Sequence, residues 1–183
     1  KPVKEPGFFR YTDAMDNPTE KYLNWKRTTI LFLSGQAISL FGSALVLSSD
    51  GALILGKMGA TTANAGRIYP PGGSLESSDV DTHGNVGVVA SIERELREET
   101  GLVAAEAVME GMLAAFDGPR VSIGRVLRFP LPADELVAVI MAELDRQEDR
   151  ELEQVIAFRS VSELDRPKVT AYSRAFAALL LVG

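Results

Sequence analysis

Short runs of apolar residues, separated by turn-forming residues, follow one another along most of the chain. The first clear pair, residues 44–47 and 53–55, is separated by Ser-Ser-Asp-Gly. Two apolar runs around a turn dipeptide are typical of a β-hairpin. Further strands are expected at residues 67–69, 108–116, 122–129 and 152–158.

Helical spacing is clearest over residues 88–100, where Val89, Ile92 and Leu96 recur on one face. Gly101 follows directly, and glycine is the preferred residue just after the end of a helix. The pattern therefore predicts a helix over 88–100. Two further helices are expected, at residues 132–147 and 170–181.

Residues 28–49 form a stretch of 22 residues without a charge, which is long enough to span a membrane as a helix. Serine, glycine and glutamine dilute its hydrophobicity, and its second half belongs to the expected hairpin. We therefore expect buried strands here and no membrane partner. Residues 1–26 are polar and lack a signal-peptide pattern, so we expect an N-terminal arm followed by one domain at residues 27–183.

The composition excludes several kinds of chemistry. The 183 residues include no cysteine and a single histidine, His83, which excludes thiolate sites and multi-histidine metal sites. His83 is expected to be a loop residue. The lack of cysteine suits a reducing compartment, so we expect a cytoplasmic protein.

The net charge of −6 argues against a nucleic acid polymer as partner. This charge is concentrated in two segments: residues 93–99 have a net charge of −2 and residues 143–153 a net charge of −4. The rest of the chain is balanced. If the two segments meet in space, they mark a site for a cation.

Three carboxylates lie close together on the helix expected at 88–100. Glu95, Glu98 and Glu99 are three and four residues apart and share one side, where like charges repel. A hard divalent cation such as Mg²⁺ or Mn²⁺ would offset this repulsion, because it prefers carboxylate oxygens. The alternative is a solvated charged face on which Arg94 and Arg97 neutralise the acids.

Residues 94–102, Arg-Glu-Leu-Arg-Glu-Glu-Thr-Gly-Leu, together with the upstream Gly73, resemble the Nudix box, G-x5-E-x7-R-E-U-x-E-E-x-G-U with U aliphatic. One departure is clear. Gly73 and Arg94 lie 21 positions apart where the family pattern has 14, and Val86 stands where the first glutamate belongs. The enlarged loop offers three acids as replacements: Glu76, Asp79 and Asp81.

The resemblance implies a Nudix α/β/α sandwich with a mixed central sheet, in the α/β (α+β) class. It also implies that Glu95 and Glu99 bind Mg²⁺ or Mn²⁺, with Glu98 a further ligand and a carbonyl at Gly72 or Gly73 joining them. Arg94 would orient the glutamates. A later acid often completes the site, and we expect Glu151 in that role ahead of Glu153, with a solvated loop as the alternative.

The reaction implied is hydrolysis of a diphosphate linkage in a nucleoside diphosphate joined to another group. Lys57 and Arg67 are candidate phosphate contacts, and Trp25, Tyr69 and Phe116 are candidates to stack on a base. The alternative is a Nudix-fold module that binds a nucleotide derivative without hydrolysing it. Many members of the family are homodimers, and the sequence leaves monomer and homodimer open.

Overall fold

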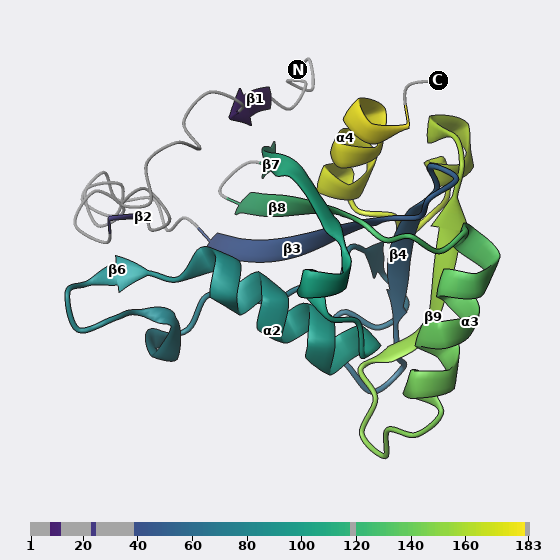
Figure 1. Cartoon of the computed structure of the whole chain (residues 1–183), viewed down its shortest axis with the longest axis horizontal. Helices are drawn as coiled ribbons and strands as arrows, with labels where there is room; N and C mark the ends of the chain where they lie inside the picture. Colours follow the sequence, from purple (N-terminus) through teal and green to yellow (C-terminus); the bar gives the residue numbers. More distant parts are fainter. Residues whose placement is uncertain (1–7, 12–22, 25–38, 118–119, 182–183) are drawn as a thin grey trace.

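A mixed β-sheet forms the centre of the molecule, with helices on both faces (Figure 1). The computed structural model describes residues 8–11, 23–24, 39–117 and 120–181. Its main sheet has the order β1-β7-β8-β3-β4-β5, and β9 also pairs with β4. The strands are β1 (Phe8–Tyr11), β3 (Ser39–Leu47), β4 (Leu53–Met58), β5 (Ile68–Tyr69), β7 (Val108–Asp117), β8 (Arg120–Arg128) and β9 (Leu152–Phe158).

Strand direction makes the sheet mixed. β3 runs parallel to β8 over its whole length, from Ser39 opposite Arg120 to Leu47 opposite Arg128. The neighbouring pairs β3–β4, β4–β9 and β7–β8 are all antiparallel. A separate two-stranded sheet joins β2 (Leu23–Asn24) to β6 (Asn85–Val86).

The alternation of side chains along β3 explains why its sequence is apolar throughout. Ala44 and Val46 belong to one buried cluster, whereas Leu45 and Leu47 belong to another on the opposite face. Because successive residues of a strand point to opposite faces, a strand covered on both sides carries no polar face. The uncharged stretch is therefore buried sheet over residues 39–47, and its residues 28–38 lie outside the described ones.

Two layers of helix complete the sandwich. The helices α2 (Val88–Thr100) and α3 (Ala133–Leu144) pack on the face of Ala44 and Val46, through side chains such as Ile92 and Leu136. The helix α4 (Ala171–Leu180) covers the other face, where Phe176 is fully buried. The expected α/β/α sandwich is confirmed.

Most predicted elements are confirmed, with small differences at their ends. Residues 88–100 and 152–158 form the expected helix and strand with the same bounds. The hairpin strand expected at 44–47 begins five residues earlier, at Ser39. Of the N-terminal arm, only residues 8–11 and 23–24 are described, so the division into an arm and one domain stays a prediction. No helix in the described part of the chain is long and apolar enough to cross a membrane.

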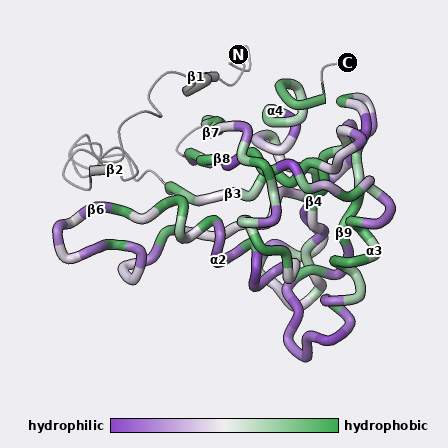
Figure 2. Tube along the Cα trace, in the orientation of Figure 1, coloured by the Kyte–Doolittle hydropathy of each residue, from purple (hydrophilic) through white to green (hydrophobic). Residues whose placement is uncertain are grey.

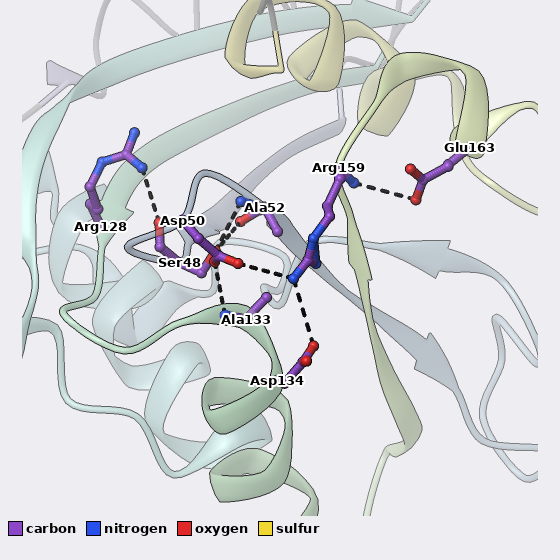
Figure 3. Close-up of polar contacts among 8 residues, drawn as sticks. All are labelled: Ser48, Asp50, Ala52, Arg128, Ala133, Asp134, Arg159 and Glu163. Atoms are coloured by element: carbon purple, nitrogen blue, oxygen red, sulfur yellow. Dashed lines mark hydrogen bonds and ion pairs between the residues drawn. The ribbon is translucent and has the colours of Figure 1, made fainter.

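The β3–β4 turn also holds the start of α3. Asp50 accepts hydrogen bonds through Oδ1 from the Ser48 hydroxyl at 2.5 Å and from the Ala133 backbone N–H at 2.9 Å (Figure 3). The N-cap residue Pro132 has no side-chain donor or acceptor, so Asp50 caps this helix from a distant turn. Arg159, the residue after β9, donates to Asp50 Oδ2 at 3.0 Å. Asp50 thus joins three segments at one corner of the fold: the β3–β4 turn, the start of α3 and the end of β9.

Candidate functional site

A cleft of about 850 Å³ opens beside α2, between the loops that leave β4 and β5 and the start of α4. Of the residues preferred from the sequence for catalysis, cation binding and phosphate contact, together with Tyr69, all but one line it. They are Arg67, Tyr69, Gly73, Arg94, Glu95, Glu98, Glu99 and Glu151. The exception is Lys57, which the structure does not bring into this wall; its ammonium pairs with Glu153 at 3.0 Å across β4 and β9.

Glu99 is the buried member of the helix carboxylates. Its residue exposure is 6%, and its Oε2 accepts a hydrogen bond from the Gly72 backbone N–H at 2.9 Å. Burial, with smaller contributions from Glu151, Glu95 and Glu98, raises the pKa of Glu99 to about 8, although the Gly72 hydrogen bond partly opposes this shift. The protein therefore holds a carboxylate where an unpaired negative charge is unfavourable.

The loop at residues 71–73 brings the backbone against both β3 and α2. Gly42 N–H donates to the Gly73 carbonyl at 3.0 Å, and Ala44 N–H donates to the Pro71 carbonyl at 2.7 Å. A Cβ at Gly72 would lie 2.1 Å from the Gly42 carbonyl oxygen, and a Cβ at Gly73 would lie 2.6 Å from Glu95 Cδ. Glycine at both positions therefore allows this loop to pass between the strand and the glutamates.

Arg94 connects α2 to the enlarged loop before it. Its Nη1 donates to Glu95 Oε1 at 2.6 Å and to Glu98 Oε2 at 3.2 Å, while Nη2 lies 3.6 Å from Asp79 Oδ1. Burial raises the pKa of Glu95, and the positive charge of Arg94 opposes that shift. The guanidinium thus fixes two of the helix glutamates relative to a loop carboxylate.

The three acids considered as replacements for the box glutamate have different positions. Asp81 Oδ1 accepts the His83 and Asn85 backbone N–H groups, so this carboxylate stabilises the loop itself. Asp79 accepts the Glu76 N–H at 2.8 Å and pairs with Arg94. Glu76 lines the cleft, so it is the one of the three that reaches the site wall.

The two acidic segments identified in the sequence meet in space. Gln147 Nε2 donates to the Glu98 carbonyl at 2.9 Å, and the Glu151 carboxylate lies close enough to Glu99 and Glu95 to raise the pKa of both. The loop between α3 and β9 that carries Glu151 is strongly hydrophilic (Figure 2). The condition under which the sequence would mark a cation site here is therefore met, and the cation site itself stays a prediction.

The remaining sequence candidates divide into cleft and non-cleft residues. Tyr69 is half-buried in the cleft, and burial, with Glu99 and Glu151 nearby, raises its pKa to about 12. Phe116 is 41% exposed on β7 and does not line the cleft. His83 lies in the exposed turn of the enlarged loop, as expected, and Trp25 lies outside the described residues.

Sequence reasoning missed four lining residues of the α4 side: Phe41, Arg120, Thr170 and Tyr172. They come from three distant parts of the chain, and no motif links them. Among the described residues, no group of three or more Asp, Glu or His side chains is already arranged as a metal site. The Arg94 contacts to Glu95 and Glu98 occupy oxygens that such a site would use.

Comparison with solved structures identifies the fold. The MutT protein from Methanosarcina mazei Go1 superposes with a TM-score of 0.52 at 18% identity, over 79% of this chain and 94% of that one. A bifunctional NMN adenylyltransferase/ADP ribose pyrophosphatase from Francisella tularensis gives a TM-score of 0.53 at 16% identity, over 85% of this chain and 44% of that one. No family model and no curated protein matches the sequence. The chain therefore shares the fold of these structures, which is the Nudix fold.

Proposed function

We propose that this protein is a Nudix hydrolase that uses Mg²⁺ or Mn²⁺ to hydrolyse a diphosphate linkage in a nucleoside diphosphate joined to another group. One observation carries the proposal: Glu99, a buried carboxylate, faces Glu95, Glu98 and Glu151 in a single cleft. Burial and mutual repulsion disfavour these charges unless a cation or a proton balances them. The sequence predicts the same four positions as site residues.

The donor set suits a hard divalent ion. Its members are carboxylate oxygens, with no thiolate and no imidazole among the lining residues. Glu95 and Glu99 would be the main ligands and Glu98 a further one. The Gly73 carbonyl, also considered as a ligand, accepts a hydrogen bond from the Gly42 N–H on the β3 side. A bound cation would neutralise phosphate oxygens and lower the pKa of a water that attacks phosphorus.

The chain's own residues have distinct tasks in this proposal. Arg94 positions Glu95 and Glu98 through its two hydrogen bonds, and Asp79 in turn limits where Arg94 can move. Arg67 lines the cleft as an exposed cation and is suited to a phosphate contact. Glu151 is exposed at the rim of the cleft and is our candidate for the group that accepts the proton of the attacking water.

A non-catalytic nucleotide-binding module is the second candidate, because Val86 occupies the place of the first box glutamate and is buried, with 6% exposure. In the hydrolase proposal, Glu76 compensates from the cleft wall. A homodimer and a cytoplasmic location stay predictions of the sequence.

Product analysis separates the two candidates. The purified protein is incubated with ADP-ribose, a sugar nucleotide, a dinucleoside polyphosphate and an acyl-CoA, with Mg²⁺, with Mn²⁺ or with EDTA. The hydrolase proposal expects cation-dependent cleavage of at least one diphosphate linkage, seen as two phosphate-bearing products. Binding of these compounds without cleavage under all three conditions supports the non-catalytic module.

A further inference from the structure

The cleft has two chemically different sides, which belong to opposite faces of the sheet. The glutamates extend from α2, which packs on the face of Ala44 and Val46. Tyr172 belongs to α4 on the other face, and Phe41 packs against the same buried cluster. The acids considered as cation ligands thus lie on one side, and an aromatic wall lies on the other.

The aromatic wall has a defined geometry. The rings of Phe41 and Tyr172 meet edge to face, with centroids 5.0 Å apart and planes at 70°. Tyr69 follows, its ring centroid 6.2 Å from that of Tyr172, and it contacts the clusters on both faces. Tyr172 is buried, with 9% exposure, and its ring packs edge to face against the half-buried ring of Phe41, so it holds Phe41 in place as a stacking surface.

Arg120 adds a cation to this side of the cleft. It is the first residue of β8, in register with Ser39, which lies two residues before Phe41 on β3. Ser39, Phe41 and Arg120 all line the cleft, so the same faces of two neighbouring strands contribute to it. The Arg120 side chain is exposed and carries five N–H donors in a fixed plane.

A short backbone path connects the two sides. Phe41 forms an isolated antiparallel bridge with Ser74, the residue after Gly73, and a Cβ at Gly73 would contact Glu95. A ligand that reaches from the glutamates past Gly73 therefore meets Phe41 next. This arrangement places a ring beside a diphosphate held at the α2 side.

We infer that Phe41, Tyr172 and Arg120 form the subsite for the nucleobase of the substrate, an inference that rests on the proposed function. The base stacks on the ring of Phe41, which the edge of the buried Tyr172 ring supports, and Arg120 donates hydrogen bonds to acceptors on the edge of the base, such as O6 and N7 of guanine. A second phosphate-rich group suits this wall poorly, because Phe41 offers only carbon and Arg120 is the one cation that lines the cleft beside it on β3 and β8 among the described residues.

The test measures binding of the α,β-methylene analogues of ADP and GDP, which cannot be hydrolysed at that linkage, and of the base-free ribose 5-diphosphate analogue. Isothermal titration calorimetry with Mg²⁺ gives Kd for wild type, Phe41→Leu, Tyr172→Leu and Arg120→Gln. The matched control is Phe116→Leu, because Phe116 is an exposed phenylalanine on β7 outside the cleft wall. Arg120→Gln changes an exposed side chain, so it tests the inference even if Tyr172→Leu fails to fold.

The inference expects wild type to bind the two nucleotides more tightly than the base-free analogue. Phe41→Leu should raise Kd for the nucleotides about tenfold, as expected for loss of one stacking partner, and Kd for the base-free analogue less than about twofold. Arg120→Gln should weaken the nucleotides selectively, and Phe116→Leu should change neither.

Two results would overturn the inference: wild type failing to discriminate the nucleotides from the base-free analogue, or Phe41→Leu and Arg120→Gln weakening all three analogues equally. Hydrolysis assays report separately on the proposed function. Loss of base selectivity with cation-dependent hydrolysis intact rejects only the subsite. Base-selective binding without hydrolysis rejects only the enzyme.

Discussion

The Glu99 carboxylate accepts a hydrogen bond from the backbone N–H of Gly72 across a distance of 2.9 Å. This contact joins two segments that are 27 residues apart and both belong to the Nudix-like pattern. It fixes a buried carboxylate at the wall of the cleft, beside the place where Gly73 approaches Glu95. The predictions below follow from this junction and from the corner that Asp50 holds.

The two glycines of the junction should respond differently to alanine. At Gly72 the new Cβ meets a backbone oxygen at 2.1 Å, which cannot move without displacing β3. Gly72→Ala should therefore lower the free energy of unfolding by about 1–3 kcal/mol. At Gly73 the contact is with the end of the Glu95 side chain, which can shift, so Gly73→Ala should fold well and lose at least about tenfold in kcat/KM. Urea unfolding and initial rates measure the two effects, and equal loss of stability in both variants would contradict this account.

Without a divalent cation, Glu99 should make stability depend on pH. Its pKa in the folded protein is raised to about 8 from 4.5, so the folded state binds more protons than the unfolded state between these values. The stability contribution is fully present below pH 4.5 and is lost as pH rises through 8. Glu99→Gln stays neutral and keeps an acceptor for Gly72. In EDTA it should be more stable than wild type at pH 9 and equal to it near pH 4.5.

Glu93→Gln serves as the control for that experiment. Glu93 lies on the same helix but pairs with Arg125 of β8 and does not line the cleft. Its variant should follow the pH dependence of wild type. A Glu99→Gln curve parallel to that of wild type between pH 5 and 9 would show that Glu99 is already ionised and balanced in the folded protein.

The positioning role of Arg94 should depend on its planar guanidinium group, which donates several hydrogen bonds at once. Lysine keeps the charge, but it cannot donate at once to Glu95 and Glu98 while remaining near Asp79. Arg94→Lys should reduce kcat about tenfold or more and leave the far-ultraviolet circular dichroism unchanged. Arg97→Lys, at an exposed position of the same helix outside the cleft lining, is the matched control and should retain activity. Equal rates in the two variants would remove Arg94 from the positioning role.

The contacts of Asp50 should make the stability of the folded protein depend on pH in the acidic range. The Ser48 hydroxyl, together with the Ala133 N–H and Arg159, holds the pKa of Asp50 below 3.8. Its contribution to stability is present above pH 3.8 and is lost as pH falls through the lowered pKa. Asp50→Asn should lower Tm at pH 7, and the gap to wild type should narrow below pH 3.8. Asp134→Asn is the control. Asp134 also pairs with Arg159, but at the longer distance of 3.7 Å and with a side chain that is 96% exposed, so its loss should change Tm little. A difference in Tm between Asp50→Asn and wild type that stays constant with pH would contradict the role of ionised Asp50 in capping α3.

The sequence predicted best the elements that are determined by local spacing alone and do not depend on pairing with a distant strand. Local periodicity and Gly101 predicted the bounds of α2, since the spacing of Val89, Ile92 and Leu96 is set by one helix alone, although the valine buried in the first turn is Val88. The start of β3 was missed because residues 39–43 include small and polar side chains, and their strand conformation depends on parallel pairing with β8 about 80 residues later.

Only the site residues that belong to the Nudix-like motif were predictable from the sequence. The helix glutamates, Arg94 and Gly73 follow from the resemblance, and the structure brings them into one cleft. Lys57, a candidate phosphate contact, lies outside the cleft lining and pairs with Glu153; this pair was not predictable, because the register of β9 against β4 cannot be read from sequence. The ion pair between Asp79 and Arg94 depends on how the enlarged loop folds back, and nothing in the spacing indicates that path.

The most direct test of the central claim is the initial rate of diphosphate hydrolysis as a function of Mg²⁺ and Mn²⁺ concentration. It compares wild type, Glu99→Gln and Glu93→Gln on the substrate that the product analysis identifies. The account predicts cation-dependent rates for wild type and Glu93→Gln, and a rate at least about tenfold lower for Glu99→Gln at saturating cation. A Glu99→Gln enzyme with the wild-type rate and the wild-type cation dependence would contradict it.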